Sequence, residues 1–168
     1  VSILIVDDEP RNLAVLESIL YSSDYRLQRA HSADEALLAL VHGDFAVLVL
    51  DINMPGMSGI ELATLIKQRK RTQHIPILFL TAYYQDEKNV LEGYGVGAVD
   101  YLTKPVNPEI LRSKVGVFVD LYRTTQALAA INHTLEVEVT QRQHAEEALR
   151  RATNELDVRV QQRTTDLT

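Results

Sequence analysis

Three short runs of consecutive apolar residues constrain the fold of this chain more than any other feature. They are residues 2–6 (SILIV), 45–50 (FAVLVL) and 75–80 (IPILFL). Each run is five or six residues long, rich in Val, Ile and Leu, and apolar on both faces, which is typical of buried parallel strands. Residues 25–30 (YRLQRA) and 98–102 (AVDYL) are two weaker strand candidates.

Segments with helical periodicity follow these runs. In residues 11–20, for example, Leu13, Leu16 and Leu20 share one stripe; residues 33–41, 60–67 and 90–94 repeat the pattern. Ser32 and Ser58 stand where helix N-caps are expected. Five strands, each followed by a helix, predict an α/β fold with a doubly wound parallel sheet. Right-handed crossovers then place helices on both faces of that sheet.

Residues 117–168 have a different pattern and contain no Gly or Pro. Leucines recur on a seven-residue grid at Leu121, Leu128, Leu135, Leu149 and Leu156. The companion seam, four residues further on, holds Thr125, Asn132, Val139, Glu146, Thr153, Val160 and Leu167, and Arg142, Glu146 and Arg163 interrupt the pattern. We predict a coiled coil that makes a homodimer through residues 118–168.

The alternative is one amphipathic helix packed back on the domain; its length argues against this, because about 50 residues at 1.5 Å each span about 75 Å, roughly twice the width of the domain. The expected division is a domain at 1–122 and a helix at 123–168 that continues the last domain helix towards a missing output module. Residues 141–167 resemble, in composition, the helical connectors of bacterial signalling proteins.

Composition excludes several classes of protein. The formal net charge of −6 argues against a nucleic-acid-binding surface, and the absence of cysteine excludes disulfides and cysteine metal sites. The apolar runs are too short for a membrane span or a signal peptide. We therefore expect a soluble, cytoplasmic protein without a membrane or nucleic-acid partner.

Chemistry is expected where the parallel strands end, because function collects beyond their carboxyl ends. The residues found there are Asp7, Asp8, Asp51, Thr81, Thr103, Lys104 and Pro105. Three adjacent carboxylates repel one another, and an oxygen-only ligand set favours Mg²⁺. Lys104 can hold a phosphoryl oxygen and Thr81 offers a hydroxyl. An isolated Asp after a strand is often only a turn or cap residue, but the set together predicts a phosphoryl site at which Asp51 is the nucleophile.

Four segments, "ILIVDDEP", "LVLDINMPGMSG", "PILFLTAY" and "GAVDYLTKP", resemble the motifs of the response-regulator receiver domain across residues 1–122. The resemblance implies a flavodoxin-like sheet of strand order 2-1-3-4-5 and a cis bond between Lys104 and Pro105. It also implies a histidine kinase or phosphotransfer protein as the phosphoryl donor. By the same resemblance Tyr83, two residues after Thr81, tunes how fast the phosphoryl group is lost, and Ala82 leaves space beside it.

The resemblance also implies a role for each site residue. Asp51 is the phosphoacceptor; Asp8 ligates Mg²⁺ directly and Asp7 largely through water. The backbone carbonyl of Asn53 completes the metal shell. The remaining roles are Lys104 as the partner of the phosphoryl group, Thr81 as the switch hydroxyl and Tyr101 as the aromatic that turns inward behind it. The flexible loop 54–59 lets the backbone approach the metal.

The predicted function is a phosphorylation-dependent switch of a two-component system that relays its state through a dimeric coiled coil to an attached effector. The alternative is a stand-alone or phosphate-sink receiver whose C-terminal helix docks a partner. Apart from its own phosphorylation and dephosphorylation we expect no enzyme activity. An aspartyl-phosphate hydrolase needs a second Asp where Asn53 stands. His133 and His144 lack the flanking residues of a kinase phosphoacceptor and are interpreted as surface residues.

Overall fold

The computed structural model describes residues 1–82 and 100–165, and the chain divides into two compact units, Val1–Tyr122 and Arg123–Thr168. In chain order the elements are β1 (Ser2–Val6), α1 (Pro10–Leu20), β2 (Arg26–Ala30), α2 (Ala33–His42), β3 (Val47–Asp51), α3 (Gly59–Gln68), β4 (Ile77–Ala82), β5 (Asp100–Lys104) and α5 (Pro108–Thr165). The helix expected at 90–94 lies outside the described residues. None of the described helices is both long enough and apolar enough to cross a lipid bilayer.

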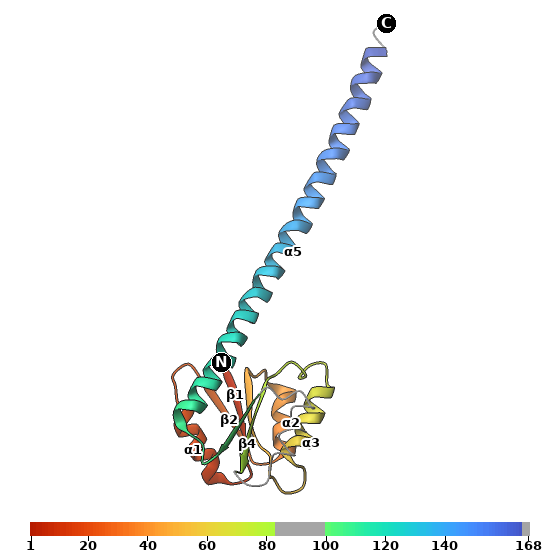
Figure 1. Ribbon diagram of the computed structural model, residues 1–168. Coiled ribbons are helices and arrows are strands. Elements are labelled where there is room, and N and C mark those ends of the chain that lie inside the picture. Colours follow the sequence, from red (N-terminus) through yellow and green to blue (C-terminus); the bar gives the residue numbers. More distant parts are fainter. Residues whose placement is uncertain (83–99, 166–168) are drawn as a thin grey trace. The chain divides into compact units, whose positions relative to one another are not determined.

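The first unit is built on a five-stranded sheet of order β2-β1-β3-β4-β5. All four strand pairs are parallel, and Ile3 lies opposite Val47 in the central pair. This confirms the expected doubly wound sheet and its flavodoxin-like strand order. Figure 1 shows α2 and α3 together on one side of the strands, with α1 on the other.

Successive residues of the central strands point to opposite faces of the sheet and contribute to two separate hydrophobic cores. Leu4, Val6, Leu48 and Leu50 face a cluster with α2 and α3, while the residues between them face a cluster with α1 and the first turns of α5. Every residue of β3 is buried. Burial on both faces explains why this strand reads as an uninterrupted apolar run.

Local signals fix where the helices begin. The Ser32 hydroxyl accepts a hydrogen bond from the Glu35 backbone N–H, and Ser58 forms a reciprocal capping box with Glu61. Both serines are therefore the N-caps that the sequence predicts. Helix α5 begins at Pro108, after Asn107, whose side chain accepts hydrogen bonds from the Glu109 and Ile110 N–H groups.

Three strands are displaced from their predicted positions. β3 begins at Val47 and includes Asp51, β4 covers Ile77–Ala82, and β5 covers Asp100–Lys104. Each lies about two residues later in the chain than the apolar run that predicts it. Phe45 and Ala46 are buried without belonging to β3, because burial alone does not require ladder pairing. The shift brings Asp51, Thr81 and Lys104 onto the strands themselves.

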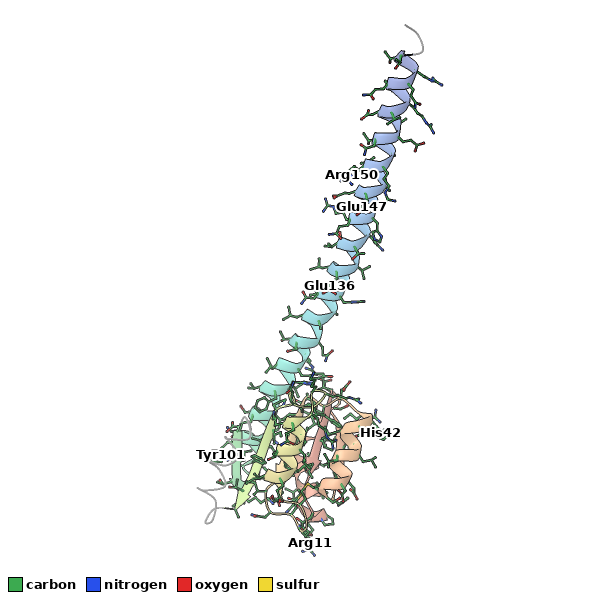
Figure 2. All side chains as sticks on the ribbon, turned by 90° about the vertical axis from the view of Figure 1, so that its right-hand side faces the viewer. Arg11, His42, Tyr101, Glu136, Glu147 and Arg150 are labelled. Carbon is green, nitrogen blue, oxygen red and sulfur yellow. The ribbon has the colours of Figure 1, made fainter. Side chains whose placement is uncertain are left out.

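The second unit is the remainder of α5. Every residue from 123 to 165 is exposed, including Leu128 at 56 %, Leu135 at 51 % and Leu149 at 69 %. Figure 2 shows its side chains projecting on all sides of the helix, with Glu136, Glu147 and Arg150 among them. Two ion pairs of i,i+4 spacing, Glu147–Arg151 and Glu155–Arg159, lie outside the leucine seam.

Candidate functional site

The carboxyl ends of the strands bring the expected acidic residues together. Asp7 and Asp8 follow β1, and Asp51 is the last residue of the neighbouring β3. One carboxylate oxygen from each lies within 4.8 Å of the others. Asp7 is completely buried and Asp51 is 4 % exposed, whereas Asp8 is exposed. Two acidic groups therefore lie beneath the surface of the sheet edge, and the third is open to solvent.

Lys104 neutralises the two buried carboxylates. It is the last residue of the edge strand β5, and its Nζ lies 2.9 Å from Asp7 Oδ2 and 2.8 Å from Asp51 Oδ1. The peptide bond between Lys104 and Pro105 is cis, as the resemblance implies. One ammonium group thus bridges two acidic residues that belong to different strand ends.

Burial dominates the electrostatics of Asp51. It raises the pKa of this carboxyl group above its ordinary value, the nearby Lys104 offsets part of the rise, and the charges of Asp7 and Asp8 add to it. For Lys104, burial lowers the pKa but the hydrogen bonds and charges of Asp51 and Asp7 outweigh it, so the net change is upward. The site holds one cation among three acids and so favours a further positive charge.

Asn12 belongs to the site although the sequence analysis missed it. Its side-chain amide Nδ2 lies 3.0 Å from Asp7 Oδ1 and 3.1 Å from Asp7 Oδ2. The Glu9 backbone N–H donates to Asp7 Oδ1 at 2.9 Å. The strand-end rule could not find Asn12, because it comes from the first turn of α1. One sequence signal could have indicated it: Asn12 follows the buried Asp7 by five residues, and Pro10 between them marks the start of a helix.

The other predicted residues occupy different environments. Thr81 is 2 % exposed and pairs with Thr103 across β4 and β5. Tyr101 is 39 % exposed, so in this structure its ring lies at the surface, as Figure 2 shows, and is not turned inward. Asn53 is exposed in the loop after Asp51. Tyr83 lies outside the described residues.

The loop after β3 is more constrained than a flexible loop would be. Gly56 has a φ of 81°, which side-chain-bearing residues rarely adopt. Gly59 is buried, and its N–H donates to the Ile52 carbonyl oxygen at 2.9 Å. A Cβ at Gly59 would overlap the Asp51 carbonyl oxygen and lie 2.9 Å from Ile52 Cα. This close approach of two backbone segments holds Asp51 in place.

The donor chemistry fits Mg²⁺. Asp7, Asp8 and Asp51 offer oxygen atoms only, and a divalent cation would relieve the repulsion among their charges. Asp8 and Asp51 could hold the ion. Asp7 has its oxygens occupied by protein donors.

Comparisons with known proteins agree with this geometry. Residues 3–116 match the family model described as the response regulator receiver domain. Among curated relatives, a Vibrio cholerae protein named "Probable cyclic di-GMP phosphodiesterase" is 40 % identical over 141 residues, which are 84 % of this chain and 32 % of that protein. The Bacillus subtilis "Transcriptional regulatory protein YvrH" is 42 % identical over 115 residues, 68 % of this chain and 47 % of that protein. The chain thus spans less than half the length of either relative.

Solved structures give the same result for the fold. Chemotaxis protein CheY4 of Vibrio cholerae has a TM-score of 0.64 at 32 % identity, covering 70 % of this chain and 97 % of that one. A two-component response regulator from Clostridium difficile has a TM-score of 0.64 at 28 % identity, covering 71 % of this chain and 95 % of that one. Matching motifs, strand order and acidic cluster all point one way: the chain belongs to the response regulator receiver domain family of two-component signalling.

Proposed function

We propose that this receiver accepts a phosphoryl group on Asp51 from a histidine kinase or phosphotransfer protein. The observation that carries the proposal is the buried Asp51 carboxylate, paired with Lys104 at 2.8 Å and clustered with Asp7 and Asp8. Asp7 is also buried, paired with Lys104 and flanked by two acids, but its oxygens accept further hydrogen bonds from the Glu9 N–H and the Asn12 amide. Receiver-family membership supplies the reaction class, and the geometry supports Asp51 as the acceptor.

The reaction transfers the phosphoryl group from a donor histidine nitrogen to Asp51. An Asp51 carboxylate oxygen attacks phosphorus, an O–P bond forms as the N–P bond breaks, and the imidazole leaves with the electron pair of that bond. When bound, Mg²⁺ supplies positive charge beside the phosphoryl oxygens. Lys104 already lies against Asp51 and exchanges part of that contact for a phosphoryl oxygen. The hydroxyl group of Thr81, on the adjacent strand β4, is proposed to move toward the new negative charge.

The output proposal rests on the second unit. Its leucine seam is apolar and exposed, while the ion pairs Glu147–Arg151 and Glu155–Arg159 lie on other faces of the helix. An isolated helix of this composition gains little stability from its own backbone. A parallel two-stranded coiled coil would bury the seam, and Asn132 within it favours in-register pairing. We therefore propose a homodimer that passes the phosphorylation state along α5.

The relatives differ in how far they match along α5. The phosphodiesterase match covers 141 of 168 residues, so it must reach residue 141 or beyond; the 115-residue match to YvrH needs no residue of the second unit. This extent favours an output of the phosphodiesterase class over a transcriptional one. A stand-alone or phosphate-sink receiver remains the competing function, and it requires no dimer.

Phosphorylation of Asp51 is tested with a small donor. The full chain with acetyl phosphate and Mg²⁺ should gain the mass of one phosphoryl group, and Asp51→Asn should gain none. Asp44→Asn is the matched control, because Asp44 is an exposed acid that lies outside the cluster. Undiminished labelling of Asp51→Asn would overturn the assignment.

A further inference from the structure

The buried Asp7 carboxylate has no oxygen position left for a metal-bound water. We infer that the side-chain amide of Asn12 competes with the hydrated Mg²⁺ ion for Asp7 and so sets the affinity of the site for the metal. Asn12 is a positioning residue in this inference, because it touches Asp7 and not the reacting atoms. The inference rests on the proposed function and concerns how the same site is loaded.

The Asp7 carboxylate is saturated with hydrogen bonds. An ionised carboxylate has about four lone-pair positions. Oδ1 accepts from the Glu9 N–H at 2.9 Å and from Asn12 Nδ2 at 3.0 Å. Oδ2 accepts from Asn12 Nδ2 at 3.1 Å and from Lys104 Nζ at 2.9 Å. All four positions are therefore filled by protein donors, and the side chain is 0 % exposed.

Of the three donors to Asp7, Asn12 is the one that can leave. The Glu9 N–H is a backbone group fixed at the start of α1, where Pro10 follows it. Lys104 is held by Asp51 as well as by Asp7. Asn12 is half-buried, and in the described part of the chain its amide donates to Asp7 alone. Asn12 also lines a cavity of about 220 Å³ with Val15, Lys104 and Val106, which gives its side chain room to move.

The consequence is an exchange of one donor for another. A metal-bound water is a charge-assisted donor and can replace the Asn12 amide on Asp7. The free energy of breaking the amide contacts is subtracted from the free energy of metal binding. Removing the amide should therefore strengthen Mg²⁺ binding while it weakens the metal-free protein, since Asp7 then loses a partner without compensation.

The test is a titration with Mg²⁺ alone, at constant ionic strength, followed by backbone amide NMR shifts of the whole chain. Asn12→Ala should lower the Mg²⁺ dissociation constant about three- to tenfold, because hydrogen bonds to charged groups are worth this much or more. Asn12→Leu removes the same donors while keeping the side-chain volume and should move the constant in the same direction. If Asn12→Ala folds poorly, the Mg²⁺ titration of Asn12→Leu decides the question.

A second readout is stability. Without Mg²⁺ both variants should unfold at lower urea concentration than the wild type, and saturating Mg²⁺ should stabilise them more than it stabilises the wild type, as linkage requires. Asn154→Ala, an exposed amide in the second unit, is the matched control and should change neither quantity. A positioning role is thereby separated from a general loss of structure, which would not tighten metal binding.

The outcomes distinguish the inference from the proposed function. Asp8→Ala should abolish the saturable shift. Wild-type binding with an unchanged or larger dissociation constant in both Asn12 variants overturns the competition. Absence of saturable binding in the wild type overturns the metal site itself, and the competition with it.

Discussion

At the scale of the residue, the surroundings of Asp51 oppose the ionised form that the proposed phosphoryl transfer requires. Burial raises its pKa, so the ionised carboxylate that a nucleophile requires is the form that the metal-free protein disfavours. Lys104 offsets only part of this effect. Burial of the reactive carboxylate therefore lowers the folding stability of the metal-free protein, and such a cost is common at functional sites.

The stability of the metal-free protein should consequently depend on pH through Asp51. Its folded pKa is above the ordinary value of 3.8, so the folded state binds this proton more tightly than the unfolded state does. The contribution of Asp51 to the free energy of unfolding thus falls as pH rises from about 3.8 through the raised pKa. Asp51→Asn should therefore be more stable than the wild type at pH 7 in the absence of divalent ions.

Urea unfolding followed by tyrosine fluorescence measures this difference. All seven tyrosines lie between residues 21 and 122, and the chain has no Trp, so the signal reports the first unit alone. The advantage of Asp51→Asn should disappear below about pH 3.8, where both states of the wild type are protonated. A wild type that is the more stable protein at pH 7 without divalent ions would contradict the argument.

The sequence predicts most of this site because strand ends converge in any parallel sheet. Asp7, Asp51 and Lys104 each end or follow a strand, so the topology alone brings them together. Asn12 could not be predicted that way. Its contact with Asp7 depends on the turn through Glu9 and Pro10, whose geometry sets which side chain of the first turn of α1 points back at the sheet. The surface position of the Tyr101 ring likewise has no signature in the motif.

At the scale of the element, the existence of each described helix and strand was predictable and its ends were less so. The N-caps Ser32 and Ser58 have side-chain signals, and both are confirmed. Strands have no comparable signal, because an apolar residue is buried whether or not its backbone pairs. This explains the displacement of β3, β4 and β5 from the runs that predict them.

The first turn of α3 provides a test of how that helix holds Asp51. Gly59→Ala would force a methyl group against the Asp51 carbonyl oxygen, so the backbone must move. We expect a loss of about 2 kcal/mol in the free energy of unfolding and slower labelling by acetyl phosphate. Urea unfolding and mass spectrometry measure the two effects.

Gly116→Ala is the matched control within the same unit. Gly116 lies inside α5, and apart from its chain neighbours and the backbone of its own helix no atom lies within 4 Å of a Cβ built there. Replacing a helical glycine by alanine should raise stability by about 0.5–1 kcal/mol and leave labelling unchanged. If Gly59→Ala behaved like Gly116→Ala, the close approach at Asp51 would carry no stability.

At the scale of the whole molecule, the proposed homodimer makes a separable prediction. Leu128→Glu combined with Leu135→Glu places charges in the apolar seam of the second unit. We expect a wild-type dimer at high micromolar concentration and a monomeric double variant, measured by light scattering. The tyrosine-detected unfolding of the first unit should stay the same in both.

Val137 and Val158 offer the control for this experiment. They are exposed apolar residues of the same helix that lie off the leucine grid. The double variant Val137→Glu, Val158→Glu adds the same charges and should remain dimeric. A monomeric wild type would favour the stand-alone receiver, whereas a seam variant that stays dimeric would show that the dimer does not form through the leucine seam.

The contact between Lys104 and Asp7 also determines when the charges of the site are complete during synthesis. Lys104 meets Asp7 across 97 positions of the chain, and β5, which carries it, follows the other four strands of the described sheet in the chain. The three acids are translated before their counter-charge, which reaches them only when β5 pairs with β4. A nascent or truncated chain that lacks β5 has the acids without the lysine, so the full set of charges exists only in the complete five-stranded sheet.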